Sequence, residues 1–411
     1  MKIGFIATRL AGTDGVSLET HKWAEVAHRL GHEVYYCAGK LEDDAPNPTL
    51  IPEFHFHDPV AEAVGELVFG RMDPPDALPL LLGEATERLK ELLHGWLNQT
   101  GIDVLVIENV LAIPMHIPLG LALAQVIEET GIPTVGHHHD FFWERQRFRL
   151  NCVPDMLWQT FPPNLPSIKH VVINSLAQRD LKTFRSLEAV IVPNVFDYDT
   201  PAPGIDDYNQ DFRQAMGFSP YDMLFLQPTR VIARKGIDLA FELLRRLREP
   251  RARLMISHQA GDEGMAYYRQ LLHRSQVSNV EVHYLASFIE EKRVVRNGRK
   301  SYTLWDVYPH ANFVTYPTLY EGFGNALLEA IYFRKPVLIN RYSVYAADIA
   351  PLGFDFVEVE GWITDEAVSE VRRLLDDPDR RQAAVDKNYE LARRHFSYDV
   401  VSAALEQLLP N

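Results

Sequence analysis

Strands and helices alternate along this chain twice over, which leaves few folds open to it. The apolar run 2–7 predicts a first strand, and the run 32–37 predicts a second one. Between these runs, apolar side chains recur at the i, i+3, i+4 and i+7 spacing of one helix face: Trp23, Val26, Ala27 and Leu30. A strand, a helix and a second strand in this order predict a parallel sheet with right-handed crossovers.

The alternation continues to residue 192, stops, and begins again after residue 203. Four further apolar runs predict strands in the first half: 104–107, 133–137, 171–173 and 189–192. Prolines, Asn, Asp and Gly fill the segment 193–203, a composition typical of a hinge or linker. Beyond it we expect a second series of strands and a helix: 223–227, 236–248, 252–256 and 280–284. The sequence therefore predicts an α/β protein with two doubly wound, Rossmann-like units that face one cleft.

Size and charge narrow the classes of function. A chain of 411 residues is long enough for two or three domains. Its formal net charge of −15 argues against a general nucleic-acid binder and against a protein held on anionic lipid by a basic surface. The most apolar stretch, 111–127, is interrupted by prolines and polar side chains, so we expect a buried segment and not a membrane span. With two cysteines, Cys37 and Cys152, and no signal segment at the start, we expect a cytoplasmic protein.

The window Glu321–Glu329 carries the clearest functional signal. An apolar strand at 312–317 precedes it and a helical run at 326–332 follows it, so its glycines lie where a strand turns into a helix. Such a turn presents unpaired backbone N–H groups to an anion, and Gly322 and Gly324 let that backbone approach a ligand. The two terminal carboxylates suit two hydroxyl-bearing parts of one phosphate-containing ligand, such as a nucleotide sugar. The alternative is ordinary turn chemistry beside a helix start.

A second group of charges follows the first strand of the second half. Arg230 and Lys235 lie in the segment 228–236, which leads from that strand into the next helix. Two fixed cations beside a helix N-terminus can bind a diphosphate and stabilise its charge as a leaving group. The alternative is that Arg234 and Lys235 are solvated charges at a helix start. Because the helix dipole disfavours cations there, the functional interpretation is favoured.

Three histidines and an aspartate end the strand predicted at 133–137. By the period of two along a strand, His137 and His139 share a face. This pair suits a metal ion only weakly, because two histidines without a further assigned ligand do not make a site. A histidine at this strand end could instead hydrogen-bond a sugar hydroxyl, or simply pack within the domain. The residues alone favour the packed interpretation slightly.

The next segment, 141–148, mixes aromatic side chains with Arg145 and Arg147. Aromatic faces suit sugar rings, and either guanidinium suits a carboxylate or a phosphate. An amphipathic helix that covers its own domain is an equally good interpretation. The basic cluster at 292–300 contains an Asn-Gly pair, which predicts a hairpin tip on a solvated surface.

Taken together, these motifs resemble the retaining glycosyltransferases of the GT-B fold, a family 4-like group that includes sucrose-phosphate synthase and bacterial mannosyltransferases. The resemblance covers the whole chain and rests above all on the E-x7-E spacing, with the Arg/Lys pair before it. It also rests on the first loop at 12–16, the histidine at 139 and the hinge segment 193–197. Many members have a glycine after the hinge asparagine, where this chain has Val195.

The resemblance implies a role for each matching residue. A first group would bind the donor: Gly15 in the loop over the phosphates, Arg230 and Lys235 on the diphosphate, Glu321 on the sugar hydroxyls, and Glu329 on the ribose. Backbone N–H groups would contact sugar and phosphate from Gly322, Phe323, Gly324 and Asn325. His139 would lie near the anomeric carbon, as a catalytic group together with Glu321, Arg230 and Lys235. We expect the acceptor to be bound by Asp14 in the first loop and, from their residue type, by Arg145 and Arg147.

The same resemblance implies the domain plan and the reaction. Residues 1–196 would form an acceptor-binding domain, residues 197–395 a nucleotide-sugar-binding domain, and 396–411 a helix that crosses back to the first. Such enzymes keep the anomeric configuration by front-face attack and need neither a metal ion nor another cofactor. We therefore expect a retaining hexosyltransferase in carbohydrate metabolism.

We expect a donor of the UDP-glucose or GDP-mannose type and a small soluble acceptor, either a sugar or a glycerate-like molecule. Neither a nucleic acid nor stable membrane insertion is expected, and a homo-oligomer is left open. Two alternatives remain at this point. One is a GT-B nucleotide-sugar epimerase or a phosphorylase, and the other is a protein that binds a nucleotide sugar without turnover.

Overall fold

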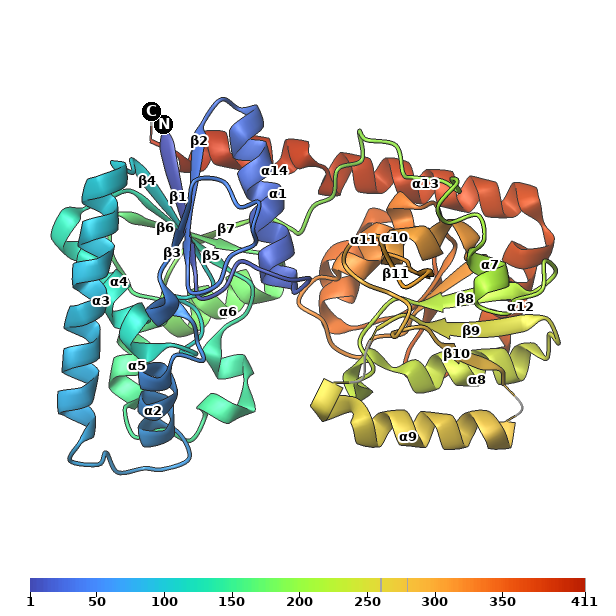
Figure 1. Cartoon of the computed structure of the whole chain (residues 1–411), viewed down its shortest axis with the longest axis horizontal. Coiled ribbons are helices and arrows are strands. Elements are labelled where there is room, and N and C mark those ends of the chain that lie inside the picture. The colour runs from blue at the N-terminus through green and yellow to red at the C-terminus, as the bar shows by residue number, and fades with distance from the viewer. Residues whose placement is uncertain (259–260, 279, 411) are drawn as a thin grey trace. The chain divides into compact units, whose positions relative to one another are not determined.

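The structure, a computed structural model, describes residues 1–258, 261–278 and 280–410. The chain forms two compact units, shown in Figure 1. Unit 1 contains residues 1–195 and 398–411, and unit 2 contains residues 196–397. Each unit has its own parallel sheet with helices around it, as the alternation of strands and helices predicts.

Unit 1 is built on a sheet of seven strands in the order β3-β2-β1-β4-β5-β6-β7, all paired in parallel. Its strands are β1 (Lys2–Ala7), β2 (Glu33–Ala38), β3 (Pro48–Leu50), β4 (Val104–Glu108), β5 (Thr134–His138), β6 (Ile168–Val172) and β7 (Ala189–Ile191). Its helices are α1 (Gly15–Arg29), α2 (Pro59–Val68), α3 (Leu78–Thr100), α4 (Ile117–Thr130), α5 (Pro154–Thr160), α6 (Ser175–Arg185) and α14 (Tyr398–Leu408).

The central strands of unit 1 are apolar on both faces because helices cover both sides of the sheet (Figure 1). Phe5 and Val106 pack on the side of α1 and α14, whereas Ile6 and Leu105 pack on the side of α3 and α4. The prediction for α1 is wrong at one position. The helix ends at Arg29, so Leu30 is a C-cap residue with 38% of its surface exposed.

The last helix belongs to unit 1, although the chain reaches it from unit 2. Val401 and Leu405 of α14 have no exposed surface, and they join the same apolar cluster as Trp23 of α1. This arrangement confirms the expected return of the C-terminal helix to the first domain. Among the described residues, none of the helices is both long enough and apolar enough to span a membrane. The apolar stretch 111–127 is instead largely buried and continues into α4.

Unit 2 is built on a sheet of six parallel strands in the order β10-β9-β8-β13-β14-β15. Its strands are β8 (Met223–Gln227), β9 (Ala252–Ile256), β10 (Val282–Tyr284), β13 (Phe313–Tyr316), β14 (Val337–Asn340) and β15 (Val357–Val359). Its helices are α7 (Phe212–Ala215), α8 (Ile237–Leu247), α9 (Gly261–Ser278), α10 (Leu304–Val307), α11 (Asn325–Tyr332), α12 (Asp365–Asp376) and α13 (Pro378–Phe396).

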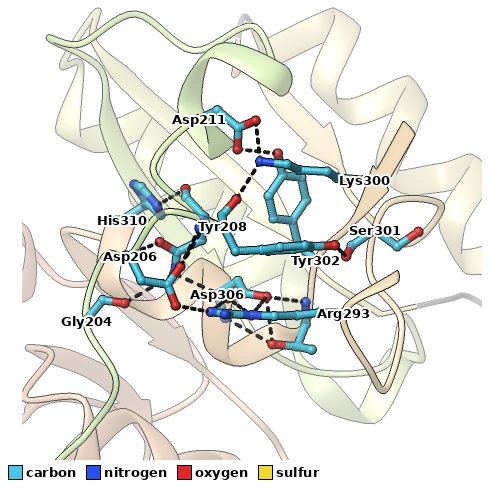
Figure 2. A network of polar contacts seen from close by, with 12 residues as sticks. Gly204, Asp206, Tyr208, Asp211, Arg293, Lys300, Ser301, Tyr302, Asp306 and His310 are labelled. Atoms are coloured by element: carbon cyan, nitrogen blue, oxygen red, sulfur yellow. Dashed lines mark hydrogen bonds and ion pairs between the residues drawn. The ribbon is translucent and has the colours of Figure 1, made fainter. Parts of the chain in front are cut away.

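A two-stranded hairpin, β11 (Val294–Arg296) and β12 (Arg299–Ser301), lies outside that sheet. Its tip is the predicted Asn-Gly pair, in which both residues have a positive φ, of 52° and 76°. Figure 2 shows that the base of the hairpin is fastened, and not merely solvated as expected. Arg293 is paired with Asp206 and Asp306, and the hydroxyl of Tyr208 donates to backbone carbonyls of both strands.

The interpretation of 141–148 as an amphipathic helix is wrong. The segment forms two 3-10 turns, Phe142–Glu144 and Gln146–Phe148. The carboxylate of Glu144 accepts a hydrogen bond from the Phe141 backbone N–H at 2.8 Å, which favours a single short turn. Aromatic side chains of the segment then pack inward, with Phe141 and Phe148 buried.

Candidate functional site

Except for His139, Arg145 and Arg147, which follow β5, the candidate residues follow one of the two strands between which the strand order of a sheet reverses. These are β1 and β4 in unit 1, and β8 and β13 in unit 2. Open α/β sheets bind ligands at the carboxyl ends of the strands at such a switch point. The segment 228–236 follows β8, and the window Glu321–Glu329 follows β13. The fold therefore places the two predicted groups of unit 2 in adjacent loops.

Gly324 is the N-cap of α11 and has φ 129°, a conformation that favours glycine. A Cβ at this position would lie 2.9 Å from the Tyr316 hydroxyl and 3.1 Å from the Tyr342 hydroxyl. Phe323 is buried, and its carbonyl accepts a hydrogen bond from Tyr342. The turn is thus packed against two buried tyrosines, one of which donates a hydrogen bond to its backbone.

An ion pair joins the two loops at this point. Lys235 donates to Glu321, and Arg234 lies 3.3 Å from the same carboxylate oxygen. Burial lowers the pKa of Lys235, and the neighbouring Glu321 opposes that shift. The Lys235 side chain is 11% exposed and the Glu321 side chain 21%, so the pair is largely shielded from solvent.

The loops are also locked by backbone contacts. The Arg234 carbonyl accepts hydrogen bonds from the Leu319 N–H at 2.8 Å and from the Thr318 hydroxyl at 3.2 Å. Gly236 has φ 61°, and a Cβ there would lie only 2.1 Å from the carbonyl oxygen of Pro317. Gly236 is therefore required by this close approach, and it fixes the position of Lys235 beside the window.

Glu329 lies on α11, one turn inside the helix, and has different partners from Glu321. Its carboxylate accepts hydrogen bonds from Trp305 Nε1 at 3.3 Å and from the Tyr308 hydroxyl at 3.5 Å. Burial, followed by the charge of Glu329, raises the pKa of Tyr308 well above its usual value. The two acids of the E-x7-E pattern thus form two separate acceptor points, as two parts of one ligand would require.

Arg230 is exposed, and it is not joined to the Lys235–Glu321 pair. His258, which follows β9, was not predicted from the sequence. Burial, followed by the charges of Arg230 and Lys235, lowers the pKa of His258 to about 4. Its imidazole is therefore neutral at pH 7, and its Nδ1 lies 2.8 Å from the Ser257 hydroxyl. A single histidine after an apolar strand gave no signal strong enough to find it.

In unit 1 the structure adds a residue that sequence reasoning missed. Glu108, the last residue of β4, is buried beside two of the predicted histidines. Its Oε2 lies 3.2 Å from His139 Nε2 and 2.9 Å from His137 Nδ1. The prediction that His137 and His139 share a face is confirmed, with ring centroids 4.4 Å apart. An acid at the end of an otherwise apolar strand was the signal that could have found Glu108.

The pKa values of Glu108 and His139 are shifted in opposite directions. Burial alone would raise the pKa of Glu108, but the neighbouring histidines lower it to about 2. Burial alone would lower the pKa of His139, yet the hydrogen bond and charge of Glu108 raise it above its usual value. Glu108 is therefore an anion that favours a protonated His139.

The same cluster could also hold a metal ion. One ligand atom from each of Glu108, His137 and His139 lies within 4.8 Å of the others. The second carboxylate oxygen of Glu108, Oε1, has no hydrogen-bond partner among the described residues. Two imidazoles and a carboxylate are a ligand set that suits zinc and similar divalent ions.

Asn109 connects this cluster to the predicted acceptor residues. It has φ 62°, and its side chain accepts from the His139 N–H at 2.9 Å and donates to Asp140 at 2.9 Å. Asp140 is in turn paired with Arg145, which is 39% exposed. Arg147 is exposed and lies 4.6 Å over the ring of Phe148.

The first loop provides a helix start and not a free carboxylate. Asp14 caps α1 by accepting hydrogen bonds from the N–H groups of Val16 and Ser17, both at 3.2 Å. It is also paired with Arg9 at 2.9 Å. Gly15 is the first residue of α1, so its backbone belongs to the positive end of that helix.

Comparison with known proteins gives matches along the whole chain. A family model described as "Glycosyl transferases group 1" matches residues 209–391. Mannosylglucosylglycerate synthase of Thermotoga maritima is 33% identical over 450 residues, which span 100% of both chains. The enzyme of the same name from Petrotoga mobilis is 31% identical over 380 residues, 87% of this chain and 86% of the relative.

Two solved structures share the fold over both units. Sucrose-phosphate synthase from Thermosynechococcus elongatus has a TM-score of 0.67 at 14% identity, covering 99% of this chain and 98% of that one. Anabaena HepE in complex with UDP-glucose has a TM-score of 0.64 at 13% identity, again covering 99% and 98%. These matches confirm the expected GT-B fold.

Proposed function

Because this chain belongs to the glycosyltransferase group 1 family, as a homologue of the mannosylglucosylglycerate synthases, we propose that it transfers a mannosyl group from a nucleotide sugar to glucosylglycerate. The relatives' names state the product, which contains a mannosyl, a glucosyl and a glycerate group. A donor of the GDP-mannose type and an anionic sugar acceptor follow from that product. Both belong to the classes of substrate expected from the sequence.

The Lys235–Glu321 pair beside the first turn of α11 is the observation that supports a nucleotide-sugar donor most directly. A diphosphate is negatively charged. It can be bound by Lys235, by the exposed Arg230 and by the N–H groups of Gly322–Asn325. Glu321 would then accept hydrogen bonds from the sugar, and Glu329 from the ribose. Such a diphosphate would lie at the switch point of the unit 2 sheet, where ligands of this fold class bind.

We propose that the anomeric configuration is retained by front-face attack. The bond between the anomeric carbon and the diphosphate oxygen breaks, while a bond forms between the same carbon and the acceptor oxygen. The acceptor proton passes to the departing diphosphate, so atoms and charge balance without a further reactant. Lys235 and Arg230 stabilise the charge that grows on the leaving group. His139, protonated and in contact with Glu108, would be a further catalytic group beside the donor sugar.

The acceptor side of the proposal rests on unit 1. Arg145 is half-exposed and is anchored by Asp140, so it is positioned to meet an anionic group. Gly15 at the start of α1 provides a helix N-terminus at the switch point between β1 and β4, and Asp14, which caps this helix and is paired with Arg9, lies beside it. A glycerate carboxylate and sugar hydroxyls are groups that these residues can recognise.

A binding panel followed by an activity assay tests the proposed function. We expect GDP, GDP-mannose or both to raise the melting temperature more than the corresponding uridine and adenosine compounds, because a ligand of the native state stabilises it. With GDP-mannose and glucosylglycerate, the product should carry an α-mannosyl group, as proton NMR of the anomeric centre would show. No transfer to glucosylglycerate from any nucleotide sugar would contradict the proposal, and an inverted product would contradict the mechanism.

We propose further that transfer needs no metal ion, because fixed cations of the chain can neutralise the diphosphate. We expect EDTA to leave the transfer rate unchanged within about twofold. The measurement compares initial rates in EDTA and in buffers with Mg²⁺, Mn²⁺ or Zn²⁺. Loss of activity in EDTA, with recovery on adding one metal, would contradict this expectation. The Glu108, His137 and His139 cluster would then be the first place to look for that ion.

A reducing compartment suits the chain. Cys37 and Cys152 are both free and buried, so neither forms a disulfide. Burial raises the pKa of the Cys37 thiol, which makes it unreactive. Free buried thiols of this kind are typical of cytoplasmic proteins.

A further inference from the structure

Unit 2 contains a cavity at the amino ends of its strands, whereas the candidate donor site lies at their carboxyl ends. Met223, Asn312 and Pro336 line the cavity, and they lie at the amino ends of β8, β13 and β14. The donor-site loops follow the carboxyl ends of β8 and β13. The cavity has a volume of about 470 Å³, which is in the range of small-molecule pockets.

Four cations line this cavity, and the lining residues include no acid. The cations are Arg213, Arg334, Lys335 and Arg381. One of them, Arg334, is paired with Asp386 and lies over the ring of Tyr389. The other three face the cavity with no carboxylate among their hydrogen-bond partners in the described part of the chain.

These three cations are held in place by neutral oxygen atoms. Lys335 Nζ donates to the carbonyl of Ala311 at 2.9 Å and to that of Pro309 at 3.3 Å. Arg213 donates to the backbone carbonyls of three residues and to one amide oxygen: Ser219, Asp222, His310 and Asn312. Such contacts fix the direction of the charged groups without neutralising them.

Arg381, on α13, is the least engaged of the three. Its Nη1 donates to the carbonyls of Leu374 and Leu375, at 3.0 and 3.1 Å. Within residues 1–258, 261–278 and 280–410, its Nε and Nη2 have no hydrogen-bond partner. A guanidinium with donors left over is suited to a two-point contact with an oxyanion.

The cations of this cavity repel one another, which is electrostatically unfavourable. Burial, followed by the charges of Arg381 and Arg213, lowers the pKa of Lys335 to about 8. Like charges that share a cavity destabilise one another, and an anion placed among them would remove that repulsion. In a chain with a formal charge of −15, a cavity whose lining residues include four cations and no acid has a local preference for anions.

We propose that this cavity binds the phosphoryl group of a small molecule, at a site separate from the donor site. Three fixed cations match the charge and the several oxygen atoms of a phosphoryl group. The cavity is larger than a bare phosphate needs, and its wall also has apolar members, Ile205 and Leu375. His310, which Figure 2 shows at one end of the hairpin network, lines the same cavity and offers a polar contact for the rest of the ligand.

One helix spans the distance between the two sites of unit 2. α11 starts at the donor window, and the chain leaves it at Phe333 directly before Arg334 and Lys335. The Lys335 N–H donates to the Ala330 carbonyl at 2.9 Å, so the lysine continues the helix end. A ligand in the cavity therefore contacts the far end of the element whose first turn faces the donor.

Isothermal titration calorimetry on the intact chain tests the site, with inorganic phosphate and with a hexose phosphate in chloride buffer of matched ionic strength. We expect Arg381→Gln to weaken binding by at least about tenfold, because it removes one charge-assisted contact. The conservative Arg381→Lys should keep most of the affinity. Arg373→Gln on α12 is the matched control, because it removes the same charge from an arginine that is absent from the cavity lining.

The donor site also attracts phosphate, so each titration is repeated in Lys235→Ala. Binding that persists in Lys235→Ala and is lost in Arg381→Gln supports the proposal. Binding that is lost in Lys235→Ala, or that is equal in Arg381→Gln and the unchanged chain, overturns it. Tighter binding of the hexose phosphate than of phosphate would identify a phosphorylated metabolite as the ligand, and equal binding would identify the free ion. Should Arg381→Gln fail to fold, Lys335→Met provides the same comparison.

Discussion

Replacing Lys235 with alanine is expected to lower kcat/KM for glycosyl transfer by about 10²–10³-fold. This range is typical for the loss of one group that stabilises charge on a leaving group or an oxyanion. Lys235 is positioned by Glu321 and by the close approach of Gly236 to Pro317, and alanine has no charged group to replace it. The loss should appear in kcat as well as in KM, because in the proposed mechanism the charge on the diphosphate grows during the reaction.

The variant should remain folded, since Glu321 keeps Arg234 as a partner. Initial-rate kinetics with GDP-mannose, together with the melting temperature of the variant, provide the measurement. Lys387→Ala, at an exposed position of α13, is a matched control and should behave as the unchanged enzyme. Near-normal kcat in Lys235→Ala would remove Lys235 from the proposed mechanism.

Replacing Glu108 with glutamine is expected to lower kcat by about 10–100-fold and to change the pH profile. Glu108 contacts the ring nitrogens of two histidines, and loss of that contact would let the His139 ring move, for which a large cost in rate is typical. Its charge also raises the pKa of His139. Without the charge, burial would lower that pKa, so protonated His139 would be lost at a lower pH.

The measurement is kcat against pH for Glu108→Gln and the unchanged enzyme. We expect the limb on the alkaline side to move toward acid pH in the variant. Glu129→Gln, in which the exposed acid at the end of α4 is changed, is the control and should leave the profile in place. An unchanged profile with a lower rate would mean that Glu108 acts on the fold and not on His139.

The same pair predicts how stability depends on pH. Because the folded-state pKa of His139 is raised, the pair adds stability that is fully present below about pH 6.5, the unfolded value, and is lost as pH rises through the folded pKa. For Glu108, whose folded pKa is lowered to about 2, the added stability is present above its unfolded pKa and is lost as pH falls through about 2. In urea unfolding, Glu108→Gln should therefore lower the free energy of unfolding, relative to the unchanged chain, by more at pH 6 than at pH 9.

The sequence predicted the strand-to-helix turn and the loop that contain the candidate residues of unit 2, because the signals for both are local. The strand-to-helix turn before α11 was readable from an apolar run, two glycines and a helical run within twenty positions. Lys235 was placed correctly after β8 for the same reason. What the sequence did not predict is that Lys235 and Glu321 form an ion pair, because that depends on β8 and β13 being neighbours in the sheet.

Residues that act through distant partners were missed. Glu108 is an acid at the end of an apolar strand, which is a weak local signal, and its contact with His139 arises only because β4 and β5 pair. The cationic cavity was equally hidden, since Arg213, Lys335 and Arg381 are far apart in sequence and are joined only by the fold. For the segment 141–148, the interpretation as an amphipathic helix was wrong because local capping by Glu144 and inward packing of aromatic side chains favour short turns.

The crossing points between the two units also bear on how the chain is made. The chain leaves unit 1 after Val195 and returns at Tyr398, so unit 2 is one continuous insertion and unit 1 is assembled from two separated pieces. On the ribosome, unit 2 can fold as soon as it has emerged, whereas the buried residues of α14 that complete the core of unit 1 are synthesised last. The first unit to be translated is therefore the last to be finished. Cutting the gene at the hinge would give a C-terminal piece that contains all of unit 2 and an N-terminal piece of unit 1 that lacks the core helix α14.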